Sequence, residues 1–548
     1  MHYHVAMSRR SYSYRPSRVP PGAVTTMRYK RRSPSPRQLI AVIALALVGA
    51  GAYAGVRALG RLDVGGTDTP IAPVAETTAS PSATIAEGFS LAHPTYLGGS
   101  LRTSTGRGPA PDALDVIWKL QIGTGLTARV TDDKLVTWSG TGWTGQPTLV
   151  YEDGAASLLI GGYDHGLRRI DAATGAVVWR ASLDDVIKGT NTVYYEPSRP
   201  AGDRLVVVTG SRRGNGLALG DPKIAPLRAF SFATGAEIWR LPVPRTENYS
   251  QDVDASPLRV DGRLIVAIEP GHVLALDTAA LVPGPDGHPQ PTVVASSPPL
   301  FTAEDVAGRT TRGGSNVVLE GSPAVAGNRI YIASSSGHVY GLNRTTLAIE
   351  WDFVSGGDLD STVVVRPDGT LLVGMERQYV EHGGVFCLDP SKPPADAVVW
   401  FFATEDRGIS EWNGGVIGSV AVSEETSGGP LAAFCSVDGY VYVVRPDETE
   451  GTSPAPDGQG TYPRPALVFR DHIGGSISTP AIVGNRMVAA GLDKTVHLYG
   501  ISDADGTTSF AEIDTFTTDG GFESTPLVWD GRVYIGCRDG YLYCLGER

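Results

Sequence analysis

The sequence predicts an all-β protein, an eight-bladed β-propeller of four-stranded antiparallel blades, preceded by one transmembrane helix. Three observations predict this class. A unit of short alternating apolar runs recurs from about residue 114 to the end, Gly (68) and Pro (39) are frequent while only 19% of residues are charged, and one uncharged apolar run lies near the N-terminus. Many short strands joined by tight turns need such a composition. The 41% of hydrophobic residues excludes a disordered chain.

Charge is unevenly distributed along the chain. Residues 1–38 hold nine Arg or Lys and no Asp or Glu, so with −12 on the whole chain the rest carries −21. An acidic folded part argues against nucleic acid as its ligand.

The apolar run near the N-terminus, Leu39–Val56, has 18 residues without a charge and is just long enough to span a bilayer. Basic residues precede it, so the positive-inside rule places the tail 1–38 in the cytoplasm and the rest of the chain outside. We therefore expect residues 39–57 to be a signal-anchor helix in the cytoplasmic membrane. Residues 58–113 are rich in Pro, Ser and Thr, which is typical of a flexible linker.

A cleaved signal peptide stays open as the alternative. Ala52-Tyr53-Ala54 has the pattern of a cleavage site, and cleavage after Ala54 would give a secreted protein. Translation from Met1, Met7 or Met27 is equally consistent with the sequence. Both readings place the propeller outside the cytoplasm.

The repeat from residue 114 onward supports the propeller. One copy reads GSPAVAGNRIYIA at 321–333, SGHVYGLN at 336–343 and then Glu350-Trp351, and the last copy reads STPLVWDGRVYIG at 524–536 and DGYLYCL at 539–545. Asp-Gly or Gly-Asn turns separate the runs, so each run is a strand of a meander. A four-stranded sheet cannot bury both faces alone, whereas sheets stacked radially can.

Two copies continue into a fourth strand with a recognisable signature. They read Asp171-Ala172-Ala173-Thr174-Gly175-Ala176-Val177-Val178-Trp179 and Ala233-Thr234-Gly235-Ala236-Glu237-Ile238-Trp239, and weaker copies end at Trp351 and Trp400. The unit resembles the PQQ-like (quinoprotein-type) β-propeller repeat. Thr-Gly makes the turn into the outer strand, and we expect the Trp to pack between neighbouring blades. The structural signature is carried by Asp171, Thr174, Gly175, Trp179, Thr234, Gly235, Trp239, Trp351, Trp400 and Trp118.

The blade count follows from the starts of the inner strands. We place these at Pro147, Pro197, Pro257, Pro323, Val363, Val420, Pro480 and Pro526, which gives eight blades over 114–548, with seven as the alternative. The last blade lacks an outer strand, because the chain stops at Arg548. The segment 115–120, which includes Trp118, has the missing pattern and is expected to close the ring.

Inner strands surround the axis, so residues at equal register form rings. Three positions before each start stand Thr144, Tyr194, Asp254, Glu320, Asp360, Ile417, Ile477 and Glu523, an acidic arc suited to a cation, a basic peptide or a polar sugar. One position before each start stand Gln146, Glu196, Ser256, Ser322, Thr362, Ser419, Thr479 and Thr525, a mostly hydroxyl ring. The candidate binding residues at the funnel mouth are Asp254, Glu320, Asp360, Trp412 and Glu523, although solvated turn acids are an alternative reading of the carboxylates.

The resemblance to this repeat class leaves the function open. Its quinoprotein dehydrogenases imply a PQQ stacked between a Trp and a disulfide of adjacent cysteines, a calcium ion held by Glu and Asn, and an Asp base. This chain has no Cys-Cys pair and no CxxCH haem motif, and Trp412 and Asn413 are neighbours in one loop. Cys387, Cys435, Cys537 and Cys544 are expected to be buried strand cysteines.

We therefore expect a membrane-anchored extracytoplasmic scaffold that binds proteins of the bacterial cell envelope. It is similar to the non-catalytic propeller lipoprotein of the β-barrel assembly machinery, although the lipoprotein cysteine is missing. We assign no catalytic residue, no metal and no cofactor, and expect a monomer that does not bind nucleic acid. The alternatives are a PQQ- and Ca-dependent oxidoreductase and a carbohydrate or cell-wall binding module.

Overall fold

The computed structural model describes residues 84–85, 88–129, 134–246, 248, 250–311, 314–315, 317–409, 412–504 and 506–548, all within the compact unit Ile71–Arg548. The predicted cytoplasmic tail 1–38 and signal-anchor 39–57 lie outside the described residues. Among the residues that are described, no helix is long and apolar enough to cross a membrane.

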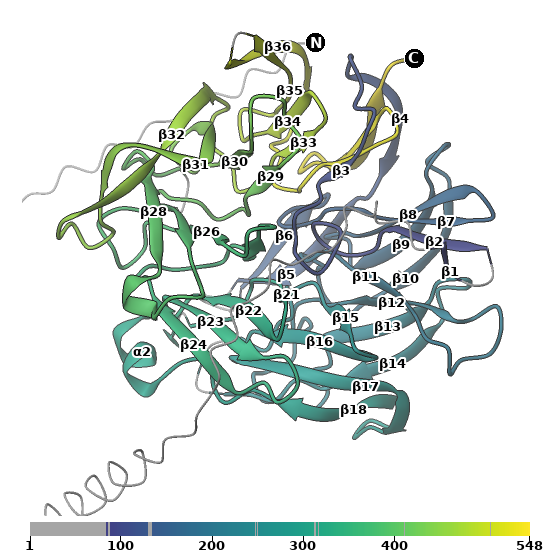
Figure 1. The fold of residues 1–548 in the computed structure, drawn as a ribbon. Coiled ribbons are helices and arrows are strands. Elements are labelled where there is room, and N and C mark those ends of the chain that lie inside the picture. The colour runs from purple at the N-terminus through teal and green to yellow at the C-terminus, as the bar shows by residue number, and fades with distance from the viewer. Residues whose placement is uncertain are drawn as a thin grey trace, which may run out of the picture. The chain divides into compact units, whose positions relative to one another are not determined.

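Eight sheets follow one another along the chain, and this confirms the predicted eight-bladed propeller of four-stranded antiparallel sheets over the alternative of seven blades (Figure 1). The first four blades are β7 (Thr148–Glu152) to β10 (Val177–Ser182) with β8 (Ala155–Gly161) and β9 (Gly166–Asp171); β11 (Thr192–Tyr195), β12 (Leu205–Thr209), β13 (Leu227–Ser231) and β14 (Glu237–Leu241); β15 (Leu258–Val260), β16 (Arg263–Ile268), β17 (His272–Pro283) and β18 (Pro289–Ser296); and β21 (Ala324–Ala326), β22 (Arg329–Ser334), β23 (His338–Asn343) and β24 (Ile349–Val354).

The remaining four blades complete the ring. They are β25 (Val364–Val365), β26 (Leu371–Met375), β27 (Gly384–Leu388) and β28 (Val398–Ala403); β29 (Ala421–Ser423), β30 (Leu431–Cys435), β31 (Tyr440–Pro454) and β32 (Thr461–His472); β33 (Ala481–Val483), β34 (Arg486–Ala490), β35 (Thr495–Ala504) and β36 (Thr507–Thr517); and β37 (Leu527–Trp529), β38 (Arg532–Gly536) and β39 (Tyr541–Gly546) with β4 (Asp115–Gln121).

Shorter elements lie outside the blades proper. Two hairpins are formed by β5 (Thr124–Ala128) with β6 (Leu135–Ser139) and by β19 (Thr310–Thr311) with β20 (Gly314–Ser315). The helix α2 (Ala303–Gly308) and the 3-10 helix η1 (Pro394–Asp396) occupy inter-strand connections. The strands β1 (Thr84–Ile85) and β2 (Phe89–His93) extend blade 1, and β3 (Gly106–Arg107) extends blade 8.

The ring closes as the sequence predicts. The outer strand of blade 8 is β4, which pairs antiparallel with β39, so that Trp118 lies opposite Cys544 (Figure 1). This pairing joins residues more than 400 positions apart and leaves blade 8 with the four strands that the other blades have.

The signature tryptophans connect neighbouring blades. In four of the five, the indole N–H donates to a backbone carbonyl of the next blade: Trp118 to Ala172 (3.0 Å), Trp179 to Phe232 (2.7 Å), Trp351 to Lys392 (3.0 Å) and Trp400 to Pro446 (2.8 Å). Trp239 is 1% exposed and packs in the core between blades 2 and 3. The expected packing of Trp between blades is therefore confirmed.

The Thr-Gly turn fits against the same tryptophans. In the first copy, Asp171 accepts hydrogen bonds from the backbone N–H and the hydroxyl of Thr174 (2.8 and 2.7 Å). Gly175 has φ +74°, and a Cβ atom there would lie 2.7 Å from the Trp118 ring; Gly235 has the same relation to Trp179. Glycine is required at this turn both by its backbone conformation and by the close approach of the indole.

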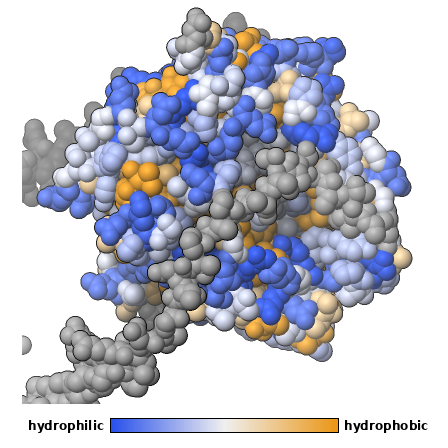
Figure 2. Space-filling view, in the orientation of Figure 1, coloured by the Kyte–Doolittle hydropathy of each residue, from blue (hydrophilic) through white to orange (hydrophobic). Residues whose placement is uncertain are grey.

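Apolar residues from adjacent blades form the core. The cluster between blades 5 and 6, for example, contains Trp400, Phe402 and Phe434. All four cysteines are buried and free, as expected: three lie in β27, β30 and β39, and Cys537 directly follows β38. The face seen in Figure 2 is mostly hydrophilic, with hydrophobic residues in small separate patches.

Residues 89–107 depart from the prediction. The sequence placed them in the flexible linker 58–113, but the structure folds them into the propeller across one end of the axis. Tyr96 is fully buried and its hydroxyl bonds to Thr479 (2.8 Å), and the guanidinium of Arg102 donates to the carbonyls of Pro323 (3.0 Å) and Ser256 (3.1 Å). The linker boundary at 113 is thus corrected to before Phe89. Its composition is polar because its partners are backbone carbonyls and hydroxyls, so it lacks the apolar periodicity of a packed segment.

The hydroxyl ring forms at this same end of the axis. Backbone N–H groups donate to the hydroxyl of the next blade: Ser256 to Ser322 (2.9 Å), Ser322 to Thr362 (2.9 Å), Thr362 to Ser419 (3.1 Å) and Ser419 to Thr479 (2.8 Å). The segment 93–102 bonds to this ring through Tyr96, whose hydroxyl contacts Ser419 and Thr479, and so covers this end of the axis.

Candidate functional site

A pocket of about 310 Å³ lies at the open end of the axis, where the chain enters the inner strands. It is lined by Trp138, Trp143, Tyr163, Lys188, Glu320, Asp360, Trp412, Ile417, Ile477, Glu523 and Arg538. Six of these residues, among them Glu320, Asp360 and Glu523, stand four positions before an inner strand, which places their side chains around the axis. The others come from β6, from the loop between β6 and β7, from the turns after β8 and β38, and from the loop before β29.

Four of the five predicted site residues line this pocket: Glu320, Asp360, Trp412 and Glu523. The fifth, Asp254, lies directly behind the wall, since its side chain is 0% exposed and forms an ion pair with Lys188. The fold therefore brings together side chains that are far apart along the chain, because residues at equal register in a propeller lie at the same level of the axis.

Blade 2 is where the predicted register is wrong. Seven inner strands begin one residue after their predicted starts, but β11 begins at Thr192, six residues earlier than Pro197 implies. Tyr194 is consequently a core residue, and Glu196 pairs with Arg259 (2.9 Å) between blades 2 and 3. The true ring members of blade 2 are Lys188 in the acidic ring and Thr190 in the hydroxyl ring, where Thr190 accepts from the backbone N–H of Gln146 (2.9 Å).

Lys188 lines the pocket but is not among the site residues that the sequence predicts. Its ammonium contacts the carboxylate of Asp254 and lies 3.6 Å from that of Glu320. It also lies 5.2 Å from the ring centroid of Trp143, in cation–π range. The spacing of the repeats gave no signal for it, because Thr144, Lys188 and Asp254 are less evenly spaced than Thr144, Tyr194 and Asp254.

Further carboxylates surround this ammonium from behind. Oxygen atoms of Asp254, Glu269 and Glu320 lie within 4.8 Å of one another, and one oxygen each of Asp254 and Glu269 has no hydrogen-bond partner among the described residues. The neighbouring Asp358 and Glu376 are 2% and 5% exposed. So many carboxylates at short range repel one another, and burial removes the water that would otherwise stabilise their charge.

The proton affinities of the cluster follow from this burial. Burial raises the pKa of Glu320 to about 8, against the opposing effect of Lys188. Burial and neighbouring carboxylates also raise the pKa values of Glu269, Asp358 and Glu376 well above their ordinary range, and that of Asp360 is raised. For Lys188, burial lowers the pKa but the carboxylates of Asp254 and Glu320 outweigh it, so its pKa is raised and the ammonium stays charged. At neutral pH the cluster thus holds protons that a bound cation would displace.

The other half of the pocket is apolar and aromatic. Trp143, Ile417 and Ile477 form one small buried cluster, against which Trp412 packs. Beside this cluster, the ring centroids of Trp138 and Tyr163 lie 5.0 Å apart. The guanidinium of Arg538 lies 4.8 Å from the Tyr163 ring centroid and donates to the carboxylate of Glu523 (2.8 Å). An acidic arc therefore faces an aromatic wall, an arrangement that suits a cation carried on an apolar stem.

The comparisons with known proteins agree with this architecture. Residues 115–282 match the family model described as outer membrane protein assembly factor BamB, and no curated protein matches the chain. A europium-containing methanol dehydrogenase shares 11% identity at a TM-score of 0.51, covering 83% of this chain and 98% of that chain. The quinohemoprotein alcohol dehydrogenase from Comamonas testosteroni shares 13% identity at a TM-score of 0.51, covering 83% of this chain and 81% of that chain. BamB from Moraxella catarrhalis shares 14% identity at a TM-score of 0.45, covering 79% of this chain and 100% of that chain.

At these identities the likeness to the solved structures concerns the fold alone. The match at 115–282 spans the two copies with the strongest Asp, Thr-Gly and Trp signature. Together with the eight observed blades, this match supports a relation to the PQQ-like β-propeller family.

Proposed function

We propose that this propeller is a non-catalytic scaffold of the cell envelope, which holds a partner protein by taking a basic side chain into its axial pocket. The observation that carries the proposal is the pairing of an acidic arc with an aromatic wall in one pocket of about 310 Å³. A lysine or arginine side chain has a long apolar stem and a charged head, so both halves of the pocket contribute to binding it. The excess negative charge of the chain beyond residue 38 adds long-range attraction for a basic partner.

The residues of the pocket fit PQQ poorly, and this favours the scaffold over the oxidoreductase. PQQ carries carboxylates, and the carboxylates of Glu320, Asp360 and Glu523 would face them across the pocket. The two cations of the lining, Lys188 and Arg538, are already paired with acids of the chain itself. No cysteine lines the pocket, so the disulfide against which PQQ stacks in the dehydrogenases has no counterpart here.

Calcium, the other group that the dehydrogenases imply, would compete with the ammonium of Lys188 for the same carboxylates. The oxygens of Asp254, Glu269 and Glu320 are the ligand type that Ca²⁺ prefers. However, Lys188 places an ammonium against two of these three carboxylates. The positive charge that a metal would supply is thus supplied by the chain, which supports a binding module without a metal.

The binding of a basic peptide is expected to depend on pH through Glu320. Below pH 8 this side chain is mostly protonated, because its pKa is raised to about 8, and a cation that binds to the carboxylate must displace the proton. The affinity for N-acetyl-trilysine amide, measured by titration calorimetry, should therefore fall by up to about tenfold per pH unit below pH 8 and level off above it.

The variant Glu320→Gln isolates this effect. It should bind the peptide more weakly above pH 8 and lose most of the pH dependence, whereas Glu448→Gln, on the exposed part of β31, should keep both the affinity and the profile of the wild type. A wild-type affinity that is flat between pH 6 and 9 would count against the role given to Glu320.

We further propose that residues 39–57 anchor the chain in the cytoplasmic membrane with the propeller outside. The support is the uncharged run Leu39–Val56 and the nine basic residues before it. Fractionation of the host cells should find the chain in the membrane with an intact N-terminus, and protease added to spheroplasts should reach the propeller. A soluble chain that begins at Gly55 would show instead that the segment is a cleaved signal peptide.

A further inference from the structure

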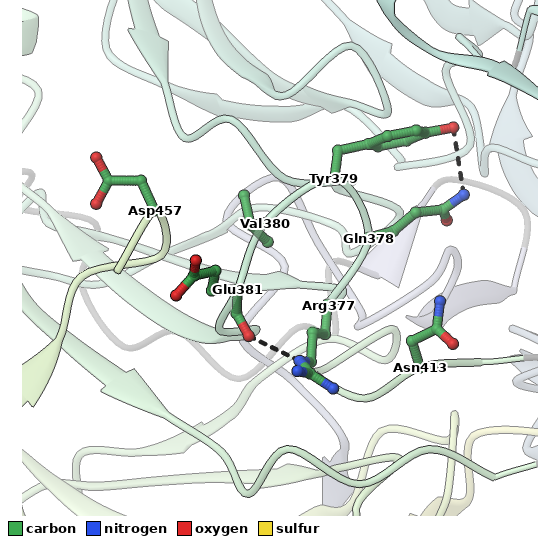
Figure 3. Close-up of a pocket in the computed structure, with 7 residues that line it drawn as sticks. All are labelled: Arg377, Gln378, Tyr379, Val380, Glu381, Asn413 and Asp457. Carbon is green, nitrogen blue, oxygen red and sulfur yellow. Dashed lines mark hydrogen bonds between the residues drawn. The ribbon is translucent and has the colours of Figure 1, made fainter. Parts of the chain in front are cut away.

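A second pocket lies over blades 5 and 6, beside the axial pocket. It has a volume of about 590 Å³ and is lined by Arg377, Gln378, Tyr379, Val380, Glu381, Asn413 and Asp457. In Figure 3, Asp457 and Glu381 lie at one side of this pocket and Tyr379 and Gln378 at the other. The lining comes from three places: the turn between β26 and β27, the loop before β29 and the tip of the β31–β32 hairpin.

The hairpin β31–β32 reaches this pocket because its extended part folds back over blade 5. The backbone N–H of Ala403 in β28 donates to Ser453 (3.4 Å), and Tyr462 packs on Phe386. At the tip, the carbonyl of Pro456 accepts from the backbone N–H groups of Glu381 (2.8 Å) and His382 (3.1 Å). The insertion in blade 6 is therefore a fixed wall of the pocket.

The turn after β26 is held in place from the other side as well. The backbone N–H of Arg377 donates to the carbonyl of Gly414 (2.9 Å), and the Nε atom of Arg377 donates to the carbonyl of Glu381 (2.7 Å; Figure 3). Tyr379 has φ +67°, a left-handed conformation that a bulky residue rarely adopts, and it is nevertheless 41% exposed. A strained and exposed aromatic residue on a well-fixed turn is typical of a binding surface.

The two pockets share one wall. Trp412 lines the axial pocket and its neighbour Asn413 lines the second. Behind them, Gly415 forms a bridge with Glu376, which belongs to the buried acidic cluster of the axis. The loop that holds Trp412 and Asn413 thus contributes to the lining of both pockets.

The second pocket has the polar groups that an extended peptide needs. The side-chain amides of Gln378 and Asn413 each offer a donor and an acceptor, which matches the N–H and C=O of a peptide group. The carboxylates of Glu381 and Asp457 are exposed and make no ion pair among the described residues. The two carboxylates attract charged basic side chains, so the charge of this pocket favours a basic polypeptide.

We propose that the axial pocket and the second pocket together bind one extended basic segment of a partner protein. One basic side chain enters the axial pocket, and the residues that follow it cross Trp412 and Asn413 and lie against Tyr379, with a second basic side chain between Glu381 and Asp457. This inference rests on the proposed function, since it extends the same site from one side chain to a peptide.

Two peptides of different length test the inference on the full-length chain in detergent. N-acetyl-trilysine amide is long enough for one pocket, and N-acetyl-octalysine amide is long enough for both. The double variant Glu381→Gln/Asp457→Asn is expected to weaken the binding of the octalysine peptide about tenfold and to leave the trilysine peptide unchanged. The control Glu448→Gln/Glu450→Gln removes the same charge from β31 outside the pocket and should bind both peptides as the wild type does.

The outcomes separate the two proposals. If the trilysine peptide binds through Glu320 but the octalysine peptide is insensitive to the double variant, the extended site is wrong and the axial site stands. If the control weakens octalysine binding as much as the double variant does, the attraction is general and the extended site is again wrong. If neither peptide binds, the proposed function itself fails. Binding of chitohexaose that is lost in Tyr379→Ala would assign the second pocket to a saccharide and overturn the peptide.

Discussion

Replacing Trp400 by alanine is expected to lower the free energy of unfolding by about 3–5 kcal/mol. Trp400 is fully buried between blades 5 and 6, and its indole N–H donates to the carbonyl of Pro446 in the next blade (2.8 Å). The substitution therefore leaves a large cavity in an interface core and removes the hydrogen bond that the repeat signature provides. Denaturant unfolding followed by circular dichroism measures the loss.

Trp412→Ala is the matched control for this substitution. Trp412 is only half-buried at the axial pocket, so its loss should affect peptide binding far more than stability. A loss of less than about 1 kcal/mol in Trp400→Ala, below the usual range for a buried aromatic residue, would mean that the signature tryptophans are not what holds neighbouring blades together.

Replacing Lys188 by alanine is expected to cost about 3 kcal/mol at pH 8, the lower end of the range for breaking a buried ion pair. Its side chain is 17% exposed, while that of Asp254 is 0% exposed. Without the ammonium, Asp254 and Glu320 face each other with no compensating charge. Because protonation relieves this repulsion, the loss of stability should shrink as the pH is lowered from 8 to 5.

A double variant shows whether the loss comes from the stranded carboxylate. Asp254→Asn in the Lys188→Ala background should restore part of the stability, since the uncompensated charge is removed. Lys223→Ala, an exposed lysine on the loop after β12, should have little effect. An equal loss of stability at pH 5 and pH 8 would show that Lys188 acts through packing and not through its charge.

The sequence carries most of the fold because the repeat is local. Each copy contains its own turns and alternation, so seven of the eight inner strands, the closing strand with Trp118 and the glycine at 175 can be predicted without knowledge of distant contacts. The acidic ring follows in turn, since Glu320, Asp360 and Glu523 hold the same position in their copies. Because the blades are related by rotation about the axis, residues at the same position of each copy lie at the same level of the axis.

The features that could not be predicted from the sequence are departures from that symmetry. Blade 2 begins at Thr192 and not near Pro197, so the register is displaced and Lys188 is hidden in a loop. The segment with Tyr96 and Arg102 has no repeat pattern, and its partners are carbonyls and hydroxyls of blades that lie hundreds of residues away. The folding of the β31–β32 hairpin over blade 5 is likewise a long-range contact that no local pattern indicates.

We expect the axial pocket to take a cationic side chain and not an anionic quinone. A pair of calorimetric titrations of the full-length chain at pH 8 tests this, one with N-acetyl-trilysine amide and one with PQQ in the presence of Ca²⁺. We expect the peptide to bind in a manner that Glu320→Gln weakens, and PQQ to give no heat of binding. Micromolar binding of PQQ that is lost in Trp412→Ala, with no binding of the peptide, would contradict the claim and assign the pocket to a quinoprotein oxidoreductase.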